Sequence, residues 1–168
     1  MTRSSVETIV RTLNDAGVRY LIAGGLAVVA HGHVRFTADL DLVLDLDPAN
    51  LTRALAAFEA MGYRPRAPVP LAAFADETAR AGWVREKGLT VFSLHSPEHA
   101  ATEIDVFVEA PFEFSGAFAR ARRTTVAPGL EATFVGYDDL IAMKRRAGRP
   151  QDLLDVERLE TLRREDAP

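Results

Sequence analysis

Aspartate and leucine residues alternate in the segment ADLDLVLDLD, which carries four carboxylates within nine residues. This period of two predicts a β-strand whose successive side chains point to opposite faces. Asp39 and Asp41 then share one face. The opposite face, which points into the core, carries Leu40, Leu42 and Leu44. Asp45 and Asp47 fit a strand end and a helix N-cap, and a solvated strand face is the alternative interpretation for the first two aspartates.

A second alternating segment, TEIDVFVEA, supplies a third carboxylate, Asp105, on its outward face. If this strand lies beside the first one, Asp39, Asp41 and Asp105 converge. Three close carboxylates repel one another and need cations, and oxygen ligands without His or Cys favour magnesium or manganese. Two such ions about 3.5–4 Å apart are suited to in-line phosphoryl transfer, which is the chemistry this pattern predicts.

Two glycines, Gly24 and Gly25, follow the apolar segment RYLIA and precede a short predicted helix. A strand that ends in glycines lets the backbone approach a phosphate, and the N–H groups of a helix N-terminus favour an anion. A tight turn alone would also explain the pair. The glycine pair becomes a specific signal because Asp39 and Asp41 follow on the next predicted strand.

Polar residues just before this strand are further candidates for the site. Arg35 and Thr37 precede Asp39 by four and two residues, so they can share its face at the strand entrance. Arg35 either contacts phosphate or forms a salt bridge with Asp39 or Asp41. His31 and His33 could bind metal or substrate, but we expect structural polar roles for both.

A lysine of the predicted helix YDDLIAMKRRAG completes the candidate set. Leu140 and Ile141 should face the core, which places Lys144 near the buried side of the helix. Its ammonium can pair with Asp152 or Asp155 of the following helix, or it can reach a phosphate while Asp152 orients it. A basic run at the end of this helix comprises Lys144, Arg145, Arg146 and Arg149, which can simply complement the helix dipole. Arg120, Arg122 and Arg123 could extend it toward an RNA or nucleotide acceptor.

The composition is that of an ordinary globular protein. The 168 residues are 48% hydrophobic and 26% charged, and the net charge of −4 argues against a general electrostatic grip on nucleic acid. The chain has no cysteine, which excludes disulfides and thiolate metal sites. It shows neither a signal-peptide pattern nor an apolar run of about 20 residues, so we expect a cytoplasmic protein without membrane contact.

Alternating helices and strands must position these residues. Apolar spacing predicts a helix near residues 6–13, and Asp47 with Pro48 begins another that ends at Gly62. Residues 64–82 read as a proline-rich loop with one helical turn. We expect hairpins at Lys87-Gly88 and in RRTTVAPGLEATFVG, and two final helices separated by GRP. The expected fold is α/β (α+β), with a mixed central β-sheet flanked by helices, in one domain of residues 1–168 whose core spans about 1–136 and whose C-terminal helical part spans about 137–165.

The string GGLAVVAHGHVRFTADLDLV resembles the nucleotidyltransferase superfamily typified by DNA polymerase β. It is most similar to the small bacterial branch of minimal nucleotidyltransferases and AbiEii-type toxins, and YDDLIAMKRRAGRPQDLLDVERL resembles the C-terminal helices of that branch. The middle of the chain, from about Gly62 to His99, matches poorly. The Gly-Gly pair departs from the commoner Gly-Ser and removes one hydroxyl donor to phosphate.

The resemblance implies specific roles for the candidate residues. Asp39 and Asp41 would bind Mg²⁺ or Mn²⁺, and Asp105 would bind metal or accept the proton of the acceptor. The nucleoside triphosphate would be bound by Gly24, Gly25, Arg35, Thr37, Lys144 and Asp152. The implied enzyme moves a nucleoside monophosphate from an NTP such as ATP to an acceptor hydroxyl.

Several functions remain open at this level. The acceptor can be RNA such as a tRNA end, a protein, or a small molecule such as an aminoglycoside or lincosamide antibiotic. The protein can also be the toxin of a toxin-antitoxin system, with an antitoxin protein as its partner. A non-catalytic or regulatory nucleotide-binding protein of the same fold is the main alternative, and three retained, mutually repelling carboxylates argue against it. A generic metal-dependent phosphohydrolase is disfavoured because a His-rich metal set is absent from the sequence.

Overall fold

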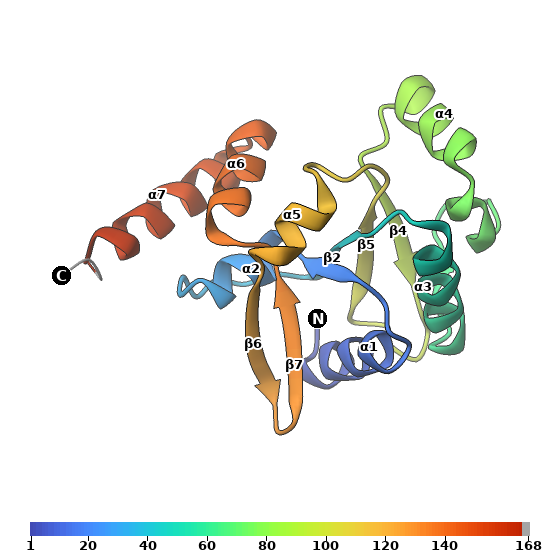
Figure 1. Ribbon diagram of the computed structural model, residues 1–168, viewed down its shortest axis with the longest axis horizontal. Coiled ribbons are helices and arrows are strands. Elements are labelled where there is room, and N and C mark those ends of the chain that lie inside the picture. The colour runs from blue at the N-terminus through green and yellow to red at the C-terminus, as the bar shows by residue number, and fades with distance from the viewer. Residues whose placement is uncertain (166–168) are drawn as a thin grey trace.

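A seven-stranded mixed β-sheet forms the centre of the computed structural model, which describes residues 1–165 (Figure 1). In spatial order the strands are β3 (Arg64–Pro65), β4 (Val91–His95), β5 (Glu103–Phe107), β2 (Asp39–Leu44), β1 (Tyr20–Ile22), β7 (Leu130–Phe134) and β6 (Arg122–Ala127). The pairs β2–β5 and β1–β7 are parallel, and the other neighbours are antiparallel. The mixed sheet predicted from the sequence is confirmed.

Helices flank this sheet on several sides. They are α1 (Arg3–Asp15), α2 (Gly24–Ala30), α3 (Pro48–Ala60), the 3₁₀ turn η1 (Leu71–Ala75), α4 (Glu77–Lys87), α5 (Phe114–Ala119), α6 (Tyr137–Ala147) and α7 (Pro150–Glu165). In Figure 1, α6 and α7 lie on one side of strands β2 and β5 and α4 lies on the other. No helix within residues 1–165 combines the length and the apolarity needed to cross a membrane.

The central strands β2 and β5 bury one face each. Leu40, Leu42, Ile104 and Val106 are at most 1% exposed and join the core formed with the apolar sides of α1 and α3. This burial removes apolar surface from water and fixes which face of each strand points inward. The aspartates at the alternate positions are therefore directed to the opposite face of the sheet, as the alternation predicted.

Local signals set the boundaries of the helices, as expected. The carboxylate of Asp47 caps α3 by accepting hydrogen bonds from the backbone N–H groups of Ala49 (3.0 Å) and Asn50 (3.2 Å). Helix α6 ends at Gly148, whose φ of +63° is a left-handed conformation that glycine adopts without strain. Helix α7 then begins at Pro150, which confirms the predicted break between the two final helices.

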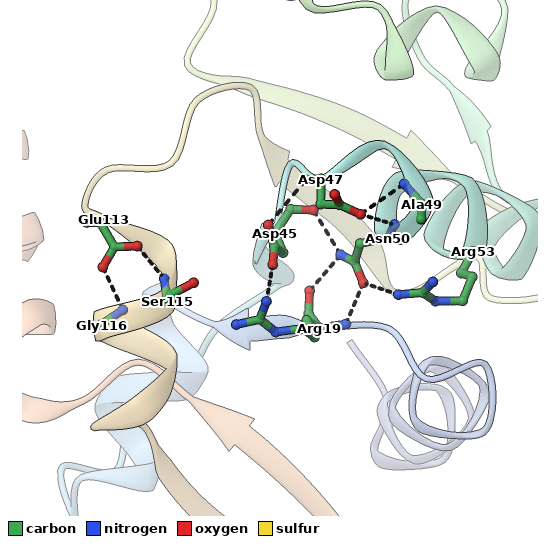
Figure 2. Close-up of polar contacts among 9 residues, drawn as sticks. All are labelled: Arg19, Asp45, Asp47, Ala49, Asn50, Arg53, Glu113, Ser115 and Gly116. Carbon is green, nitrogen blue, oxygen red and sulfur yellow. Dashed lines mark hydrogen bonds and ion pairs between the residues drawn. The ribbon is translucent and has the colours of Figure 1, made fainter.

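A polar network at the far end of β1 and β2 ties these strands to α3 (Figure 2). The side chain of the buried Asn50 accepts a hydrogen bond from the N–H of Arg19 (2.7 Å) and donates to the carbonyl oxygens of Arg19 (3.0 Å) and Asp45 (2.8 Å). Arg19 also pairs with the carboxylate of Asp45 at 2.5 Å. The network therefore joins the start of β1 and the end of β2 to the first turn of α3.

The predicted hairpin at Lys87-Gly88 is wrong, because this segment is the end of helix α4. The carboxylate of Asp76 caps the helix by accepting from the N–H of Thr78 (2.8 Å), and Gly88 ends it with a φ of +60°. The proline-rich loop expected over residues 64–82 is correspondingly shorter, since α4 begins at Glu77. Trp83 of α4 stacks on Phe92 of β4 with ring centroids 5.1 Å apart. This packing on the sheet stabilises a helix whose own pattern is weak. The second expected hairpin is present as β6 and β7.

Candidate active site

A pocket of about 860 Å³ opens on the face of the sheet that carries the aspartates. Residues from both ends of the chain line it, including the loop before β2 and the helices α6 and α7. It brings together all nine site residues that the sequence suggested, which are Gly24, Gly25, Arg35, Thr37, Asp39, Asp41, Asp105, Lys144 and Asp152. The sequence therefore identified residues that are far apart in the chain and adjacent in the fold.

The three candidate carboxylates lie on adjacent parallel strands, as predicted. Asp41 of β2 is the register partner of Asp105 of β5, while Asp39 is the partner of Glu103. Directly opposite residues on paired strands have side chains on the same face of the sheet. Asp39, Asp41 and Asp105 therefore face the pocket together, whereas Glu103 does not line it and forms an ion pair with Arg66.

The electrostatics of this cluster show mutual repulsion. The pKa of Asp41 is raised to about 6, first by burial and then by the negative charges of Asp105 and Asp39, against the lowering effect of Lys144 and Arg35. The pKa of Asp39 is also raised, first by burial and then by Asp105 and Glu103. Both carboxylates are held in their charged form at a cost, which is the behaviour of like charges close together.

A divalent cation would relieve this repulsion, and the donor set suits one. Within residues 1–165, no three Asp, Glu, His or Cys side chains are already arranged as a metal-binding group. The carboxylates on β2 and β5 are nevertheless hard oxygen donors of the kind that magnesium and manganese prefer. Burial and the neighbouring carboxylates raise the pKa of Asp41 by more than Lys144 and Arg35 lower it, so a further positive charge beside Asp41 would stabilise its charged form. The residues fit a divalent cation in the chemistry of their donor atoms.

The glycine pair is required by close approach to other site residues. Gly24 has a φ of +58°, and a β-carbon at this position would overlap the carboxylate of Asp41. A β-carbon on Gly25 would lie 2.5 Å from the hydroxyl oxygen of Thr37 and 2.7 Å from Nη2 of Arg35. Side chains larger than hydrogen at either position would push these groups away. Gly24 and Gly25, which begin α2 and are called the glycine turn below, therefore pack directly against the acidic cluster and the loop before β2.

Lys144 is 4% exposed and lies between two carboxylates of α7. Its Nζ donates hydrogen bonds to Oδ1 of Asp152 (3.0 Å) and to Oδ2 of Asp155 (2.7 Å). Leu140 and Ile141 are buried beside it, as predicted from their spacing. Both of the structural partners considered from the sequence are thus present at once, and the pocket still reaches the lysine.

Arg35 pairs with Asp155 and, within residues 1–165, with neither Asp39 nor Asp41, so of its two alternative roles the salt bridge to these aspartates is wrong and the phosphate contact stays a prediction. Its Nε lies 3.3 Å from Oδ1 of Asp155, whose side chain is fully buried. The reason is geometric, since α7 presents a buried carboxylate to the loop before β2. Sequence reasoning considered Asp155 only as a partner of Lys144 and missed its contact with Arg35. The available signal was the spacing of Asp155, three residues after Asp152 on one helix face.

Other polar residues have structural roles. Nε2 of His31 is 2.8 Å from the carbonyl oxygen of Val135, and the imidazole packs edge-on against Tyr137, in line with the structural role expected. Arg120 forms an ion pair with Asp139 at 2.6 Å. Neither Arg120 nor its neighbours Arg122 and Arg123 line the pocket. These three arginines therefore do not extend the basic run of α6 into the pocket.

The pocket continues past Asp105 along an apolar wall. Its residues come from α4, the loop after it, β4, β5 and α6, and are Val84, Leu89, Val91, Phe107 and Met143. Arg146 and Arg149 stand at its rim. The site therefore has a charged half around the aspartates and an apolar half that can accept a less polar group.

Comparison with models of protein families finds no match to this chain, and comparison with curated proteins finds none. Solved structures match it over nearly its whole length. The lincosamide antibiotic adenylyltransferase LnuA, solved with lincomycin bound, has 15% identity and a TM-score of 0.61, over 95% of this chain and 97% of that chain. ANT(2'')-Ia in complex with adenylyl-2''-tobramycin has 15% identity and a TM-score of 0.59, over 94% and 86%. An antigenic nucleotidyltransferase-like protein from Paracoccidioides brasiliensis has 17% identity and a TM-score of 0.58, over 95% and 75%.

These similarities show that the chain has the fold of the nucleotidyltransferases. The sheet and its flanking helices account for the extent of the match. The branch that includes the AbiEii-type toxins stays a prediction. The identities are too low to transfer a substrate or a residue role, so the function rests on the pocket and its residues.

Proposed function

We propose that this protein is a nucleotidyltransferase that moves a nucleoside monophosphate from an NTP to a hydroxyl group of an acceptor. The observation that carries the proposal is the convergence of three repelling carboxylates, two cations and a glycine turn in one pocket. Carboxylates of this kind bind divalent metal, and the cations with the glycine turn suit a triphosphate. Few other functions need a metal-binding cluster and a triphosphate-binding group within one pocket.

The acidic cluster is assigned to metal binding. Asp39, Asp41 and Asp105 would hold Mg²⁺ or Mn²⁺, which when bound would neutralise phosphate charge and polarise the phosphoryl group. The raised pKa of Asp41 supports this assignment, because such a carboxylate gains most from a nearby cation. Asp105 is also placed to accept the proton of the attacking hydroxyl.

The remaining residues bind and orient the triphosphate. Gly24 and Gly25 offer backbone without a β-carbon, while Arg35 and Thr37 lie against the second glycine. Lys144 adds a third donor group from α6 and is oriented by Asp152. In the transfer, the acceptor oxygen forms a bond to the α-phosphorus as the bond to the bridging oxygen breaks. Pyrophosphate leaves with that electron pair, and the hydroxyl proton passes to Asp105.

The proposed acceptor is a small hydroxyl-bearing molecule. The apolar half of the pocket suits a compact ligand, and the three arginines expected to extend toward RNA lie outside it. The net charge of −4 also disfavours a nucleic-acid acceptor. Two structures of the same fold were solved with lincomycin and with adenylyl-2''-tobramycin, which are small molecules of this kind. A protein acceptor and a toxin role with an antitoxin partner are the alternatives.

Labelled transfer tests the proposal directly. The protein is incubated with Mg²⁺ and each of the four NTPs labelled at the α-phosphate, with separate pools of hydroxyl-bearing small molecules, total RNA and total protein. We expect label in the small-molecule pool with release of pyrophosphate, and none with the variant that combines Asp39→Asn and Asp41→Asn. Label in RNA or protein would replace the acceptor assignment. Triphosphate binding without transfer of label to any pool would support the non-catalytic, nucleotide-binding alternative, and absence of both binding and transfer would remove the proposed function.

A further inference from the structure

A single carboxylate of α7, Asp155, contacts both cationic side chains of the candidate site, Lys144 and Arg35. Oδ2 of Asp155 accepts a hydrogen bond from Nζ of Lys144 at 2.7 Å. Oδ1 lies 3.3 Å from Nε of Arg35 and accepts a hydrogen bond from Nε2 of Gln151 at 3.0 Å. Lys144 belongs to α6 and Arg35 to the loop before β2, so three separate segments meet at one side chain.

The burial of Asp155 makes these contacts energetically important. Its side chain is fully buried, and a carboxylate removed from water is stable only when cations and hydrogen-bond donors surround it. Asp152 differs in this respect, because it keeps some exposure, contacts Lys144 at 3.0 Å and lies 4.0 Å from Arg149. Asp152 makes no ion pair with Arg35 within residues 1–165. Only Asp155 links the two cations.

Two of the three guanidinium nitrogens of Arg35 contact other groups of the protein. Nε lies 3.3 Å from Oδ1 of Asp155 in an ion pair without a hydrogen bond, and Nη1 donates a hydrogen bond to the carbonyl oxygen of Phe36 at 3.0 Å. Nη2 then extends over Gly25, where a β-carbon would be only 2.7 Å away. The contacts of Nε and Nη1 thus leave Nη2 of Arg35 directed toward the glycine turn of the pocket.

We propose that Asp155 is a positioning residue that holds Arg35 and Lys144 together in the arrangement that binds a triphosphate. The inference rests on the proposed function and deepens it. Asp155 does not line the pocket and acts only through the two cations. Because the cations are fixed before the ligand arrives, binding does not have to order two long side chains.

A double-mutant cycle on triphosphate affinity tests this role without any acceptor. The probe is the magnesium complex of adenosine 5'-(α,β-methylene)triphosphate, titrated calorimetrically into the full chain. We expect Arg35→Met to weaken binding by at least about tenfold in the wild-type background, as for the loss of a charged hydrogen bond. In the Asp155→Asn background we expect the same change to weaken binding by less than about threefold, because an unanchored Arg35 contributes little.

The matched control is Glu160→Gln. Glu160 also joins α7 to α6 through an ion pair, with Arg145 at 2.5 Å, but neither residue lines the pocket. In that background the effect of Arg35→Met should stay at least about tenfold. If Asp155→Asn does not fold, Asp155→Glu replaces it, since it keeps the charge and displaces the carboxylate by one methylene group. The effect of Arg35→Met should then shrink at least about threefold.

The outcomes separate the inference from the proposed function. An equal effect of Arg35→Met in the wild-type and Asp155 backgrounds would overturn the positioning role while triphosphate binding remained intact. A reduced effect in the Glu160→Gln background would also overturn it, because any α6–α7 ion pair would then suffice. Absence of binding by the wild-type protein would remove the proposed function, and the positioning role with it.

Discussion

Asp41 and Asp105 lie directly opposite each other on the parallel strands β2 and β5, with both side chains on the pocket face of the sheet. A structural sheet gains nothing from like charges at directly paired positions, because such pairs are destabilising. The pair costs stability that the buried leucine and valine residues on the other face must offset. Both side chains line the pocket, and the proposed function assigns them to a divalent cation.

The first prediction concerns the cost of this repulsion. Replacing Asp41 by Asn in the presence of a chelator should increase the free energy of unfolding at pH 7. The charged form of Asp41 is disfavoured by a pKa raised to about 6, which corresponds to roughly 1–3 kcal/mol after allowance for solvent screening. Urea denaturation of both proteins measures the difference. A variant less stable than wild type under these conditions would show that the carboxylates do not repel strongly.

The second prediction concerns pH. The pKa of Asp41 is higher in the folded state than in the unfolded state, so the folded protein binds this proton more tightly. The stability that protonation of Asp41 contributes is fully present below about pH 4 and is lost as pH rises through about 6. Asp41 therefore lowers the free energy of unfolding as pH increases. Asp39 acts in the same direction. The difference in unfolding free energy between Asp41→Asn and wild type should therefore grow from pH 4 to pH 7. A difference independent of pH would contradict the shifted pKa.

The third prediction concerns metal and nucleotide. A triphosphate should raise the melting temperature when Mg²⁺ or Mn²⁺ is present and leave it nearly unchanged in chelator, because the carboxylates repel phosphate without a cation. At a ligand concentration of about 100 times Kd, the added stability should be about 2.7 kcal/mol. Differential scanning fluorimetry measures the shift. Equal shifts with and without the divalent ion would separate nucleotide binding from the acidic cluster.

The fourth prediction uses two glycines with similar backbone conformations. Gly24 has a φ of +58° and contacts Asp41, whereas Gly129 has a φ of +67° and no atom within 4 Å of a built β-carbon. Gly129→Ala should cost only backbone strain, about 1 kcal/mol. Gly24→Ala should cost about 2–4 kcal/mol and abolish triphosphate binding, since the new methyl group displaces the carboxylate. Chemical denaturation and calorimetric titration measure the two effects, and equal costs would show that the close approach to Asp41 is unimportant.

The fifth prediction concerns Lys144. Lys144→Ala should lower nucleotide transfer by about two to three powers of ten per folded molecule, as for removal of one electrostatic stabiliser. It should also cost about 3–5 kcal/mol of stability, because two α7 carboxylates lose their buried partner. The control is Arg145→Ala, whose exposed ion pair contributes little to either quantity. Transfer at a normal rate by the folded fraction of Lys144→Ala would leave the lysine with a structural role alone.

Periodicity made much of the site predictable. Because strand side chains alternate, the order of residues in two segments was enough to place Asp39, Asp41 and Asp105 on one face and the leucines on the other. Helical spacing likewise placed Lys144 beside Leu140 and Ile141 on the buried side of α6. These features depend on neighbours within one element, which the sequence shows directly.

Contacts between distant segments could not be predicted in the same way. Helix α4 was interpreted as part of a hairpin because its apolar pattern is weak, and its packing on Phe92 depends on the sheet. The contact of Arg35 with Asp155 joins residues 120 positions apart and requires the docking of α7. No local period encodes such a pairing, so the sequence offered only the nearer Asp39 and Asp41 as alternatives to a phosphate contact.

The parallel pairing of β2 with β5 has a consequence for the order of folding. About sixty residues separate the ends of this pair, and α3, β3, α4 and β4 must be passed before Asp105 can lie beside Asp41. Asp155 is synthesised later still. A nascent chain therefore carries the glycine turn with Asp39 and Asp41 long before the side chains of Lys144 and Arg35 can pair with Asp155. Long-range pairings of this kind form slowly. We expect nucleotide capture to appear in a single late step, and an incomplete chain on the ribosome to leave the cellular triphosphate pool untouched.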